Sequence, residues 1–278
     1  VQHLLSISQE ISPRLKTAKR VMLLCDYDGT LTPIVERPEL AILPEQTKHL
    51  LSELAHQGRF TIGIISGRAL ADLKERVGIN DIIYAGNHGL EIEGPGIGFT
   101  YPLAEEMRPV FRLMQQILTK ALAPIRGVFV ENKGLTISVH YRMVEEEKSD
   151  ELKSIFEKVL DTAISLGRIR TTHGKKVYEV RPAVDWDKGK AIALLINTYG
   201  KSKTGKEVLP IFLGDDSTDE DGFRIIEKYK GISIFVGEKT EDSAARYYLK
   251  SPTEVAAFMN LLLQPGKSEQ TNTMLQVN

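Results

Sequence analysis

The chain has little of what marks a secreted, membrane-embedded or nucleic-acid-binding protein. Among its 278 residues there is one cysteine, Cys25, so an internal disulfide is excluded and a reducing, cytoplasmic location is expected. No apolar run reaches the roughly 18 residues that a transmembrane helix needs, and residues 1–20 lack the pattern of a signal peptide. The net charge of −1 gives no basic excess of the kind that nucleic-acid binders carry. We therefore expect no membrane and no nucleic-acid partner, and we also expect a monomer.

What the chain does have is an ordinary globular composition, 42% hydrophobic and 26% charged, with length for about two domains. Buried strands alternate with helices over residues 21–90 and again from residue 187, which predicts an α/β fold with a parallel sheet. The stretch between them reads as short antiparallel strands with two long helices, over 105–122 and 145–166. The linkers near Gly94–Pro102 and Pro182–Asp185 carry the Gly and Pro expected of hinges. We expect a Rossmann-like core of residues 1–100 and 185–278, interrupted by an inserted α+β domain of residues 101–184.

The most informative segment is an apolar run that ends in Asp26-Tyr-Asp28-Gly-Thr30. Side chains two apart on a strand share a face, so Asp26 and Asp28 can reach one substrate atom from two directions. One carboxylate could attack phosphorus while the other moves a proton, and aspartyl-phosphate chemistry is established for carboxylate nucleophiles. Cys25 points to the opposite face by alternation, and we expect it to be core packing.

A surface turn or a calcium loop could show the same Asp-x-Asp-Gly letters. An EF-hand loop starting at Asp26 would need Gly at its sixth position and Glu at its twelfth, where this chain has Leu31 and Arg37. The buried strand before the motif also argues against an isolated turn.

Further polar residues follow buried strands or open a helix, where ligands of parallel α/β sheets bind. We assign Asp26 as nucleophile, Asp28 as acid and base, Ser66 as hydrogen-bond donor and Lys188 as a positive charge. A phosphate beside carboxylates requires a cation, and we expect Mg²⁺. Its expected ligands are Asp26, the carbonyl of Asp28 and Asp215. The expected phosphate contacts are Thr30, Gly67 and Asp216.

Each of these residues also has an ordinary structural interpretation that involves no catalysis. Taken alone, Ser66 is a good helix N-cap, Lys188 a solvated lysine, and Gly214-Asp215-Asp216 a turn. Asp219 and Glu220 could be ordinary acids of a first helical turn. Their order along the chain is harder to explain separately.

The ordered set D-x-D-G-T, S-G-R, Lys188 and G-D-D-x-T-D-E resembles the four motifs of the haloacid dehalogenase (HAD) phosphatase superfamily. The resemblance implies an HAD core with a C2-type cap inserted between the second and third motifs. It also implies a metal-dependent hydrolase that works through an aspartyl-phosphate.

Segments 85–91, 130–142, 176–182 and 186–191 narrow the resemblance to the trehalose-6-phosphate phosphatase family, over residues 20–262. The resemblance implies hydrolysis of trehalose 6-phosphate to trehalose and phosphate, in trehalose biosynthesis. It further implies that Glu131, Lys133 and Glu179 grip the sugar. Other expected substrate contacts are Arg68, Asn87, His88 and Arg142, and the roles of Arg68, His88, His140 and Arg142 stay open; the two arginines could bind phosphate or pair with acids.

Three other functions stay open at this point. The chain could be another capped sugar phosphatase, acting on sucrose phosphate or mannosyl-3-phosphoglycerate. It could be a non-catalytic sugar-phosphate sensor, although no motif residue is damaged. A receiver-type signalling domain also phosphorylates an aspartate, but it would need neither Asp28 as an acid nor a cap.

Overall fold

The computed structural model describes residues 1–174, 176–200 and 208–264, so residues 265–278 of the expected core lie outside it. The chain divides into two compact units, one made of Val1–Ile97 with the residues from Asp187 onward, the other of Gly98–Trp186. We call them the core unit and the inserted unit. The catalytic and cap roles that the sequence predicts for them remain proposals.

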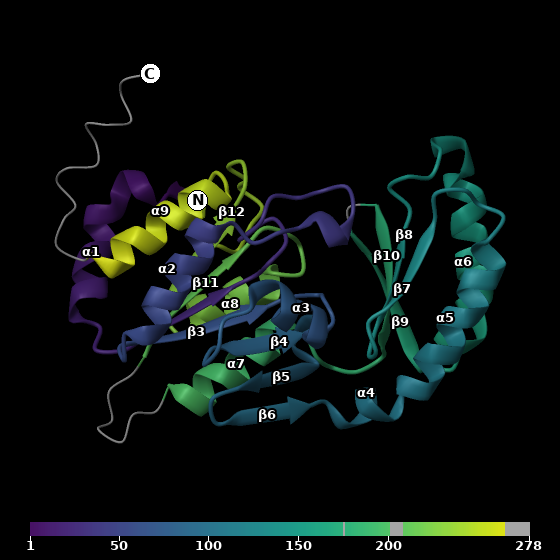
Figure 1. Cartoon of the computed structure of the whole chain (residues 1–278), viewed down its shortest axis with the longest axis horizontal. Helices are drawn as coiled ribbons and strands as arrows, with labels where there is room; N and C mark the ends of the chain where they lie inside the picture. The colour runs from purple at the N-terminus through teal and green to yellow at the C-terminus, as the bar shows by residue number, and fades with distance from the viewer. Residues whose placement is uncertain (175, 201–207, 265–278) are drawn as a thin grey trace. The chain divides into compact units, whose positions relative to one another are not determined.

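The core unit contributes eight strands and the first residue of β6 to a nine-stranded sheet, whose order is β1-β13-β12-β11-β2-β3-β4-β5-β6. Figure 1 labels six of these strands, β12, β11, β3, β4, β5 and β6. The strands of the sheet are β1 (Gln2–His3), β2 (Val21–Cys25), β3 (Phe60–Ile65), β4 (Ile83–Gly86), β5 (Glu91–Gly94), β6 (Ile97–Thr100), β11 (Leu209–Gly214), β12 (Ile232–Val236) and β13 (Tyr247–Leu249). In the order of the sheet, each strand from β1 through β13, β12, β11, β2 and β3 to β4 pairs in parallel with the next. Strand β5 runs antiparallel to β4. The expected α/β fold with a parallel-dominated sheet is confirmed.

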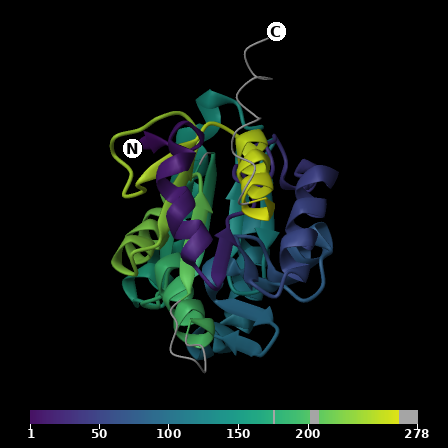
Figure 2. The ribbon, with the colours of Figure 1, turned by 90° about the vertical axis from the view of Figure 1, so that its left-hand side faces the viewer.

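Helices cover both faces of this sheet. They are α1 (Ser8–Thr17), α2 (Glu45–His56), α3 (Leu70–Val77), α7 (Lys188–Tyr199), α8 (Glu220–Lys228) and α9 (Pro252–Leu263). Figures 1 and 2 show α1, α2 and α9 on one side, where their apolar faces share a core with alternate strand residues such as Leu23 and Cys25. On the other side Phe212 of β11 packs against Phe223 of α8. Cys25 is buried, as expected.

The inserted unit has its own sheet and its own core. Its elements are α4 (Pro102–Glu106), α5 (Arg108–Leu122), β7 (Phe129–Asn132), β8 (Ile137–His140), α6 (Ser149–Ser165), β9 (Ile169–Gly174) and β10 (Val177–Pro182). The strands lie in the order β7-β8-β10-β9, with antiparallel pairing throughout. Alternate residues such as Val139 and Val180 pack on α5 and α6. The opposite face carries a polar row in which Glu131, Ser138, Glu179 and Thr172 lie side by side.

Two local expectations need correction. The boundary between the units falls at Ile97 and Gly98, within the linker expected near 94–102, but much of that stretch is strand, because β5 and β6 extend the sheet there. The helix expected over 105–122 is interrupted at Met107, between α4 and α5. Pro109 lies at the start of α5, where its missing N–H costs no hydrogen bond.

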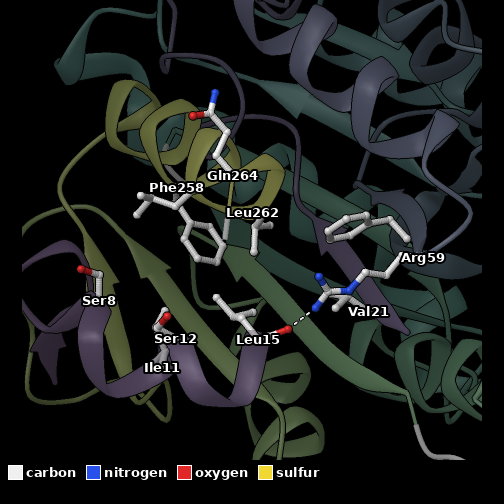
Figure 3. A pocket seen from close by; sticks show the side chains of 11 residues that line it. Ser8, Ile11, Ser12, Leu15, Val21, Arg59, Phe258, Leu262 and Gln264 are labelled. Carbon is white, nitrogen blue, oxygen red and sulfur yellow. Dashed lines mark hydrogen bonds between the residues drawn. The ribbon is translucent and has the colours of Figure 1, made fainter. Parts of the chain in front are cut away.

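Figure 3 shows a small cavity near the start of β2 and β3, at the opposite end of these strands from the motif residues. Its volume is about 30 Å³, enough for only one or two waters. It cannot hold a sugar phosphate. Its lining residues are Ser8, Ile11, Ser12, Leu15, Val21, Arg59, Phe60, Phe258, Leu261, Leu262 and Gln264.

No helix in the described ranges is both long and apolar enough to span a bilayer.

Candidate active site

The residues singled out in the core gather at one edge of its sheet. Strands β11, β2, β3 and β4 are consecutive neighbours and run parallel. The loops after them begin with Asp215, Asp26, Ser66 and Asn87. Because the carboxyl ends of parallel strands meet at one edge, these loops form a common site.

A buried ionic cluster lies at the centre of this site. Lys188, the first residue of α7, donates from Nζ to Asp26 Oδ1 at 2.7 Å and to Asp219 Oδ1 at 2.6 Å. The three side chains are 3%, 7% and 0% exposed, respectively. Asp187 caps α7 by accepting a bond from the Lys190 amide at 2.8 Å. Buried charges persist only when paired, so these side chains hold one another in place.

The cluster carries more negative than positive charge. Burial raises the pKa of Asp26; Lys188 lowers it, but Asp219 and Asp215 raise it again, and the pKa stays well above its usual range. Burial likewise raises the pKa of Asp219 to about 6 despite the neighbouring Lys188. The pKa of Lys188 is also raised: burial acts to lower it, and the surrounding carboxylates outweigh that effect. A nucleophilic Asp26 must be ionised, so the cluster favours an added cation.

The donor set suits a hard divalent cation. One carboxylate oxygen from each of Asp26, Asp215 and Asp219 lies within 4.8 Å of the others. Magnesium and calcium prefer such oxygen ligands. Gly29, with a positive φ of 87°, allows this approach, because a Cβ there would lie 2.2 Å from Asp215 Oδ2. Asp215 is 9% exposed.

Asp28 sits differently from the other acids. Its side chain is 43% exposed and is held by Arg68, which donates from Nε to Oδ2 and from Nη2 to Oδ1, each at 2.7 Å. Arg68 also donates to Asp72 Oδ2 at 2.8 Å and to the Pro38 carbonyl at 2.8 Å. Of the two alternatives that the sequence leaves open for Arg68, pairing with acids is what the structure shows.

The loops after β3 and β4 are interlocked. The amide of His88 donates to the Ser66 carbonyl at 2.9 Å, and that of Asn87 to the Arg68 carbonyl at 2.7 Å. Asn87 and His88 both have positive φ, which is unusual for residues with a side chain. The His88 ring lies against Gly67, where an added Cβ would be 2.6 Å from it.

Ser66 and Thr30 are both buried at this edge. Ser66 Oγ accepts a bond from the Arg68 amide at 3.2 Å, and α3 begins only at Leu70, so Ser66 is not its N-cap. Within the described part of the chain, Thr30 Oγ1 has no hydrogen-bond partner. A buried hydroxyl of this kind requires a ligand, ion or water to bond with.

Asp216 is fixed by Thr218, whose amide and hydroxyl donate to Oδ1 at 2.8 and 2.7 Å. Burial acts to raise the pKa of Asp216, but Lys188, the Thr218 bonds and nearby His88 lower it below its usual value. Asp216 is therefore ionised at neutral pH.

The residues expected to grip the sugar lie on the polar face of the inserted unit. Glu131 accepts from His140 Nε2 at 2.8 Å. Glu179 accepts from Arg181 Nε at 2.5 Å and lies 3.6 Å from Lys133 Nζ. These carboxylates are thus oriented by neighbours within the same unit. Arg142, just after β8, is half-buried.

Sequence reasoning missed two residues of the core site. The sequence allows Asp219 to be an ordinary first-turn acid, but Asp219 is buried, accepts a bond from Lys188 and accepts bonds from the amides of Asp215 and Asp216. Its four-residue spacing from Asp215 was the available signal. Asp72 was not singled out, and only its helical i+4 spacing from Arg68 could have indicated it.

The chain matches the family model "Trehalose-phosphatase" over residues 24–253. It is 34% identical over 275 residues to the probable trehalose-phosphate phosphatase 4 of Oryza sativa subsp. japonica, covering 98% of this chain and 73% of that protein. It is 35% identical over 277 residues to the trehalose 6-phosphate phosphatase RA3 of Zea mays, covering 94% and 75%.

Solved structures share the fold. The C-terminal domain of the Candida albicans trehalose-6-phosphate phosphatase superposes with a TM-score of 0.79 at 24% identity, covering 91% of this chain and 95% of that domain. The Aspergillus fumigatus trehalose-6-phosphate phosphatase gives a TM-score of 0.61 at 28% identity, with 91% and 96% coverage. With its motif residues assembled at one sheet edge and this match over most of its length, the chain belongs to the trehalose-phosphatase family.

Proposed function

We propose that this chain is a hydrolase that converts trehalose 6-phosphate to trehalose and phosphate. The observation that carries the proposal is the buried cluster of Asp26 with Lys188 at the carboxyl edge of the sheet, in a member of the trehalose-phosphatase family. The alternative sugar phosphatases are not favoured by these relatives.

In the first step, an Asp26 carboxylate oxygen forms a bond to phosphorus while the bond from phosphorus to the sugar oxygen breaks. Asp28 gives its proton to that departing oxygen. Lys188 keeps Asp26 oriented and offsets negative charge as the phosphoryl group approaches. General acid help of this kind is typically worth about 10²–10⁴-fold in rate.

In the second step, water attacks the phosphorus of the aspartyl-phosphate and gives its proton to Asp28. The bond between Asp26 and phosphorus breaks, which releases phosphate and restores both carboxyl groups. Ser66, Thr30 and the Gly67 amide are proposed to hydrogen-bond the transferring oxygens.

Asp26, Asp215 and the Asp28 carbonyl would hold a divalent cation, for which we propose Mg²⁺, and Asp219 is close enough to add a fourth oxygen. When bound, the cation supplies positive charge that offsets repulsion between phosphate and carboxylates. Two observations support a cation here: among the described residues the Thr30 hydroxyl has no hydrogen-bond partner, and burial raises the pKa of Asp26.

For the sugar, we propose that Glu131, Lys133 and Glu179 accept and donate bonds to the disaccharide hydroxyls. A site built on fixed polar groups can reject analogues that lack the matching hydroxyl by about 10⁴-fold. Asn87, His88, Arg142 and Asp216 are further proposed contacts. The cytoplasmic location and the monomeric state remain predictions.

The test is phosphate release from a panel of sugar phosphates, with Mg²⁺ and with a chelator. We expect trehalose 6-phosphate to be the best substrate and the chelator to abolish turnover. Asp26→Asn should nearly abolish activity, and Asp28→Asn should slow it by orders of magnitude. Full activity of purified Asp26→Asn would refute the nucleophile assignment.

The sugar assignment has a separate test. Glu131→Ala should raise the KM for trehalose 6-phosphate far more than the KM for p-nitrophenyl phosphate, which has no sugar. An equal effect on both substrates would argue against a sugar contact.

A further inference from the structure

The hydrogen bonds of Arg68 account for nearly all of its donors. A guanidinium has five N–H groups. In Arg68, the N–H of Nε and one N–H of Nη2 donate to Asp28. The second N–H of Nη2 donates to the Pro38 carbonyl, and one N–H of Nη1 donates to Asp72. Four of the five N–H groups are therefore engaged within the core unit, which leaves little capacity for gripping a phosphate.

Arg68 is itself held in place from several sides. It is only 6% exposed, and its guanidinium carbon lies 5.1 Å from the ring centre of Tyr27. The single N–H of Arg76 Nε is shared between the two carboxylate oxygens of Asp72, at 2.8 and 2.9 Å. Burial acts to raise the pKa of Asp72, but the bonds from Arg76 and Arg68 outweigh it and lower the pKa. The charge that anchors Arg68 is therefore permanent at neutral pH.

The side chain of Asp28, by contrast, has Arg68 as its one hydrogen-bonding partner among the described residues. It lies past the end of β2, and its side chain is 43% exposed. A short exposed carboxylate on a loop can rotate about its side-chain bonds. Two parallel bonds from one planar guanidinium fix both the position and the plane of such a group.

We propose that Arg68 is a positioning residue for Asp28, and that it serves catalysis by aiming this carboxylate rather than by binding the phosphate. The inference rests on the proposed function, in which Asp28 moves the proton. A small misplacement of a catalytic group can cost about 10²-fold in rate. Loss of Arg68 should therefore lower kcat and leave substrate binding nearly unchanged.

The test is a double-mutant cycle on trehalose 6-phosphate with Mg²⁺ present. Arg68→Ala should lower kcat by about ten- to a hundredfold, with the KM and the inhibition constant of inorganic phosphate changed less than about twofold. In an Asp28→Ala background, the same change should have almost no further effect on the residual kcat. Arg68→Lys, which keeps the charge but loses the two-bond geometry, should restore only part of the rate.

Asp72→Asn extends the test to a residue that does not touch Asp28. It should lower kcat in the same direction as Arg68→Ala but by less, and again only when Asp28 is present. Lys74→Ala is the matched control, because it removes an exposed ion pair with Glu93 from the same helix and should leave kcat unchanged. Thermal unfolding of every variant identifies loss of structure, and Arg68→Lys with Asp72→Asn decides the matter if Arg68→Ala does not fold.

Two results would overturn the inference. A raised KM and a raised phosphate inhibition constant in Arg68→Ala would make Arg68 a phosphate ligand. An equal loss of kcat with and without Asp28 would make it a general structural support. If Asp28→Ala itself kept wild-type turnover, the acid assignment of the proposed function would fail instead.

Discussion

At the scale of single residues, the active-site edge concentrates carboxylates around one lysine. Asp26 and Asp219 bond the Lys188 ammonium directly, and Asp216 adds to the field that raises its pKa. Such an arrangement is costly without a further positive charge. The core site thus has an excess of negative charge, which a bound cation can offset when the anionic substrate binds.

The raised pKa of Asp219 predicts that cation binding at this site depends on pH. A pKa of about 6 means that Asp219 holds a proton below that pH and is ionised above it, and a carboxylate must be ionised to ligate a cation. We therefore expect saturating Mg²⁺ to raise the melting temperature clearly at pH 7.5 and much less at pH 5. Asp219→Asn should reduce the shift at pH 7.5. Equal Mg²⁺ shifts at both pH values in the wild type would contradict this.

The contact between Gly67 and His88 predicts two mutations whose effects depend on each other. Gly67→Ala would place a methyl group 2.6 Å from the buried His88 ring and should lower kcat/KM by at least tenfold, because the loop amides move. Because His88 is also a proposed substrate contact, the effect of Gly67→Ala is measured again in a His88→Ala background, where it should be much smaller because there is room for the methyl group. Gly58→Ala is the control, since a Cβ there meets nothing within 4 Å. A loss from Gly67→Ala that is equally large in both backgrounds would exclude the steric explanation.

Some of the site residues could be predicted from the sequence alone and others could not. Asp26, Asp28, Ser66 and Asp215 were predictable because each follows a buried apolar strand. The burial of Asp219 was not, because an acid at the start of a helix is usually solvated, and only the fold brings Lys188 against it. The Arg68 pairing was likewise undecided, because its two acids come from different elements.

At the scale of elements, the start of α7 delivers Lys188 into the site. This requires α7 and α8 to approach closely, and Gly189 makes the approach possible. A Cβ at Gly189 would lie 2.6 Å from the Asp221 carbonyl oxygen, a backbone atom that cannot swing aside. The helix start also carries a positive partial charge, which suits an anionic substrate.

We predict that Gly189→Ala separates the two helices and moves Lys188 away from Asp26 and Asp219. Both the melting temperature and kcat should fall, even though alanine has the higher helix propensity. Thr198→Ala, an exposed change on the same helix, should alter neither. A Gly189→Ala enzyme with wild-type kcat would show that Lys188 tolerates such a shift.

The central strands were predictable as elements because their apolar runs are continuous. The pairing of β5 and β6 at the sheet edge was not, because Gly94 and its neighbours resemble a hinge and a strand edge depends on partners distant in sequence. The break at Met107 follows from Pro109, which lies about one turn into the helix expected over 105–122. The sequence alone did not indicate that this proline would begin a new helix.

At the scale of the whole molecule, residues 98–186 form a continuous insert with a separate core. The two ends of the insert lie side by side. The Trp186 ring stacks on that of Phe99 with 5.1 Å between ring centres, and its centre lies 5.4 Å from that of Tyr101. Adjacent ends allow a domain to be inserted without straining its host.

We therefore expect the fragment 98–186 to fold alone. Its urea unfolding, followed by the fluorescence of Trp186, should be a single cooperative transition. Phe156→Ala, which empties a buried position between α6 and the sheet, should cost about 3–5 kcal/mol and leave the fragment largely unfolded. A fragment with no cooperative transition would show that its core needs the rest of the chain.

The burial of Cys25 has a practical consequence. It is completely buried, and burial raises the pKa of its thiol far above the ordinary range, so maleimide dyes should not modify it in the folded protein. Because the sequence has no other cysteine, a thiol introduced into each unit could carry a fluorophore without background labelling. Energy transfer between two such dyes would then follow any movement between the units during turnover.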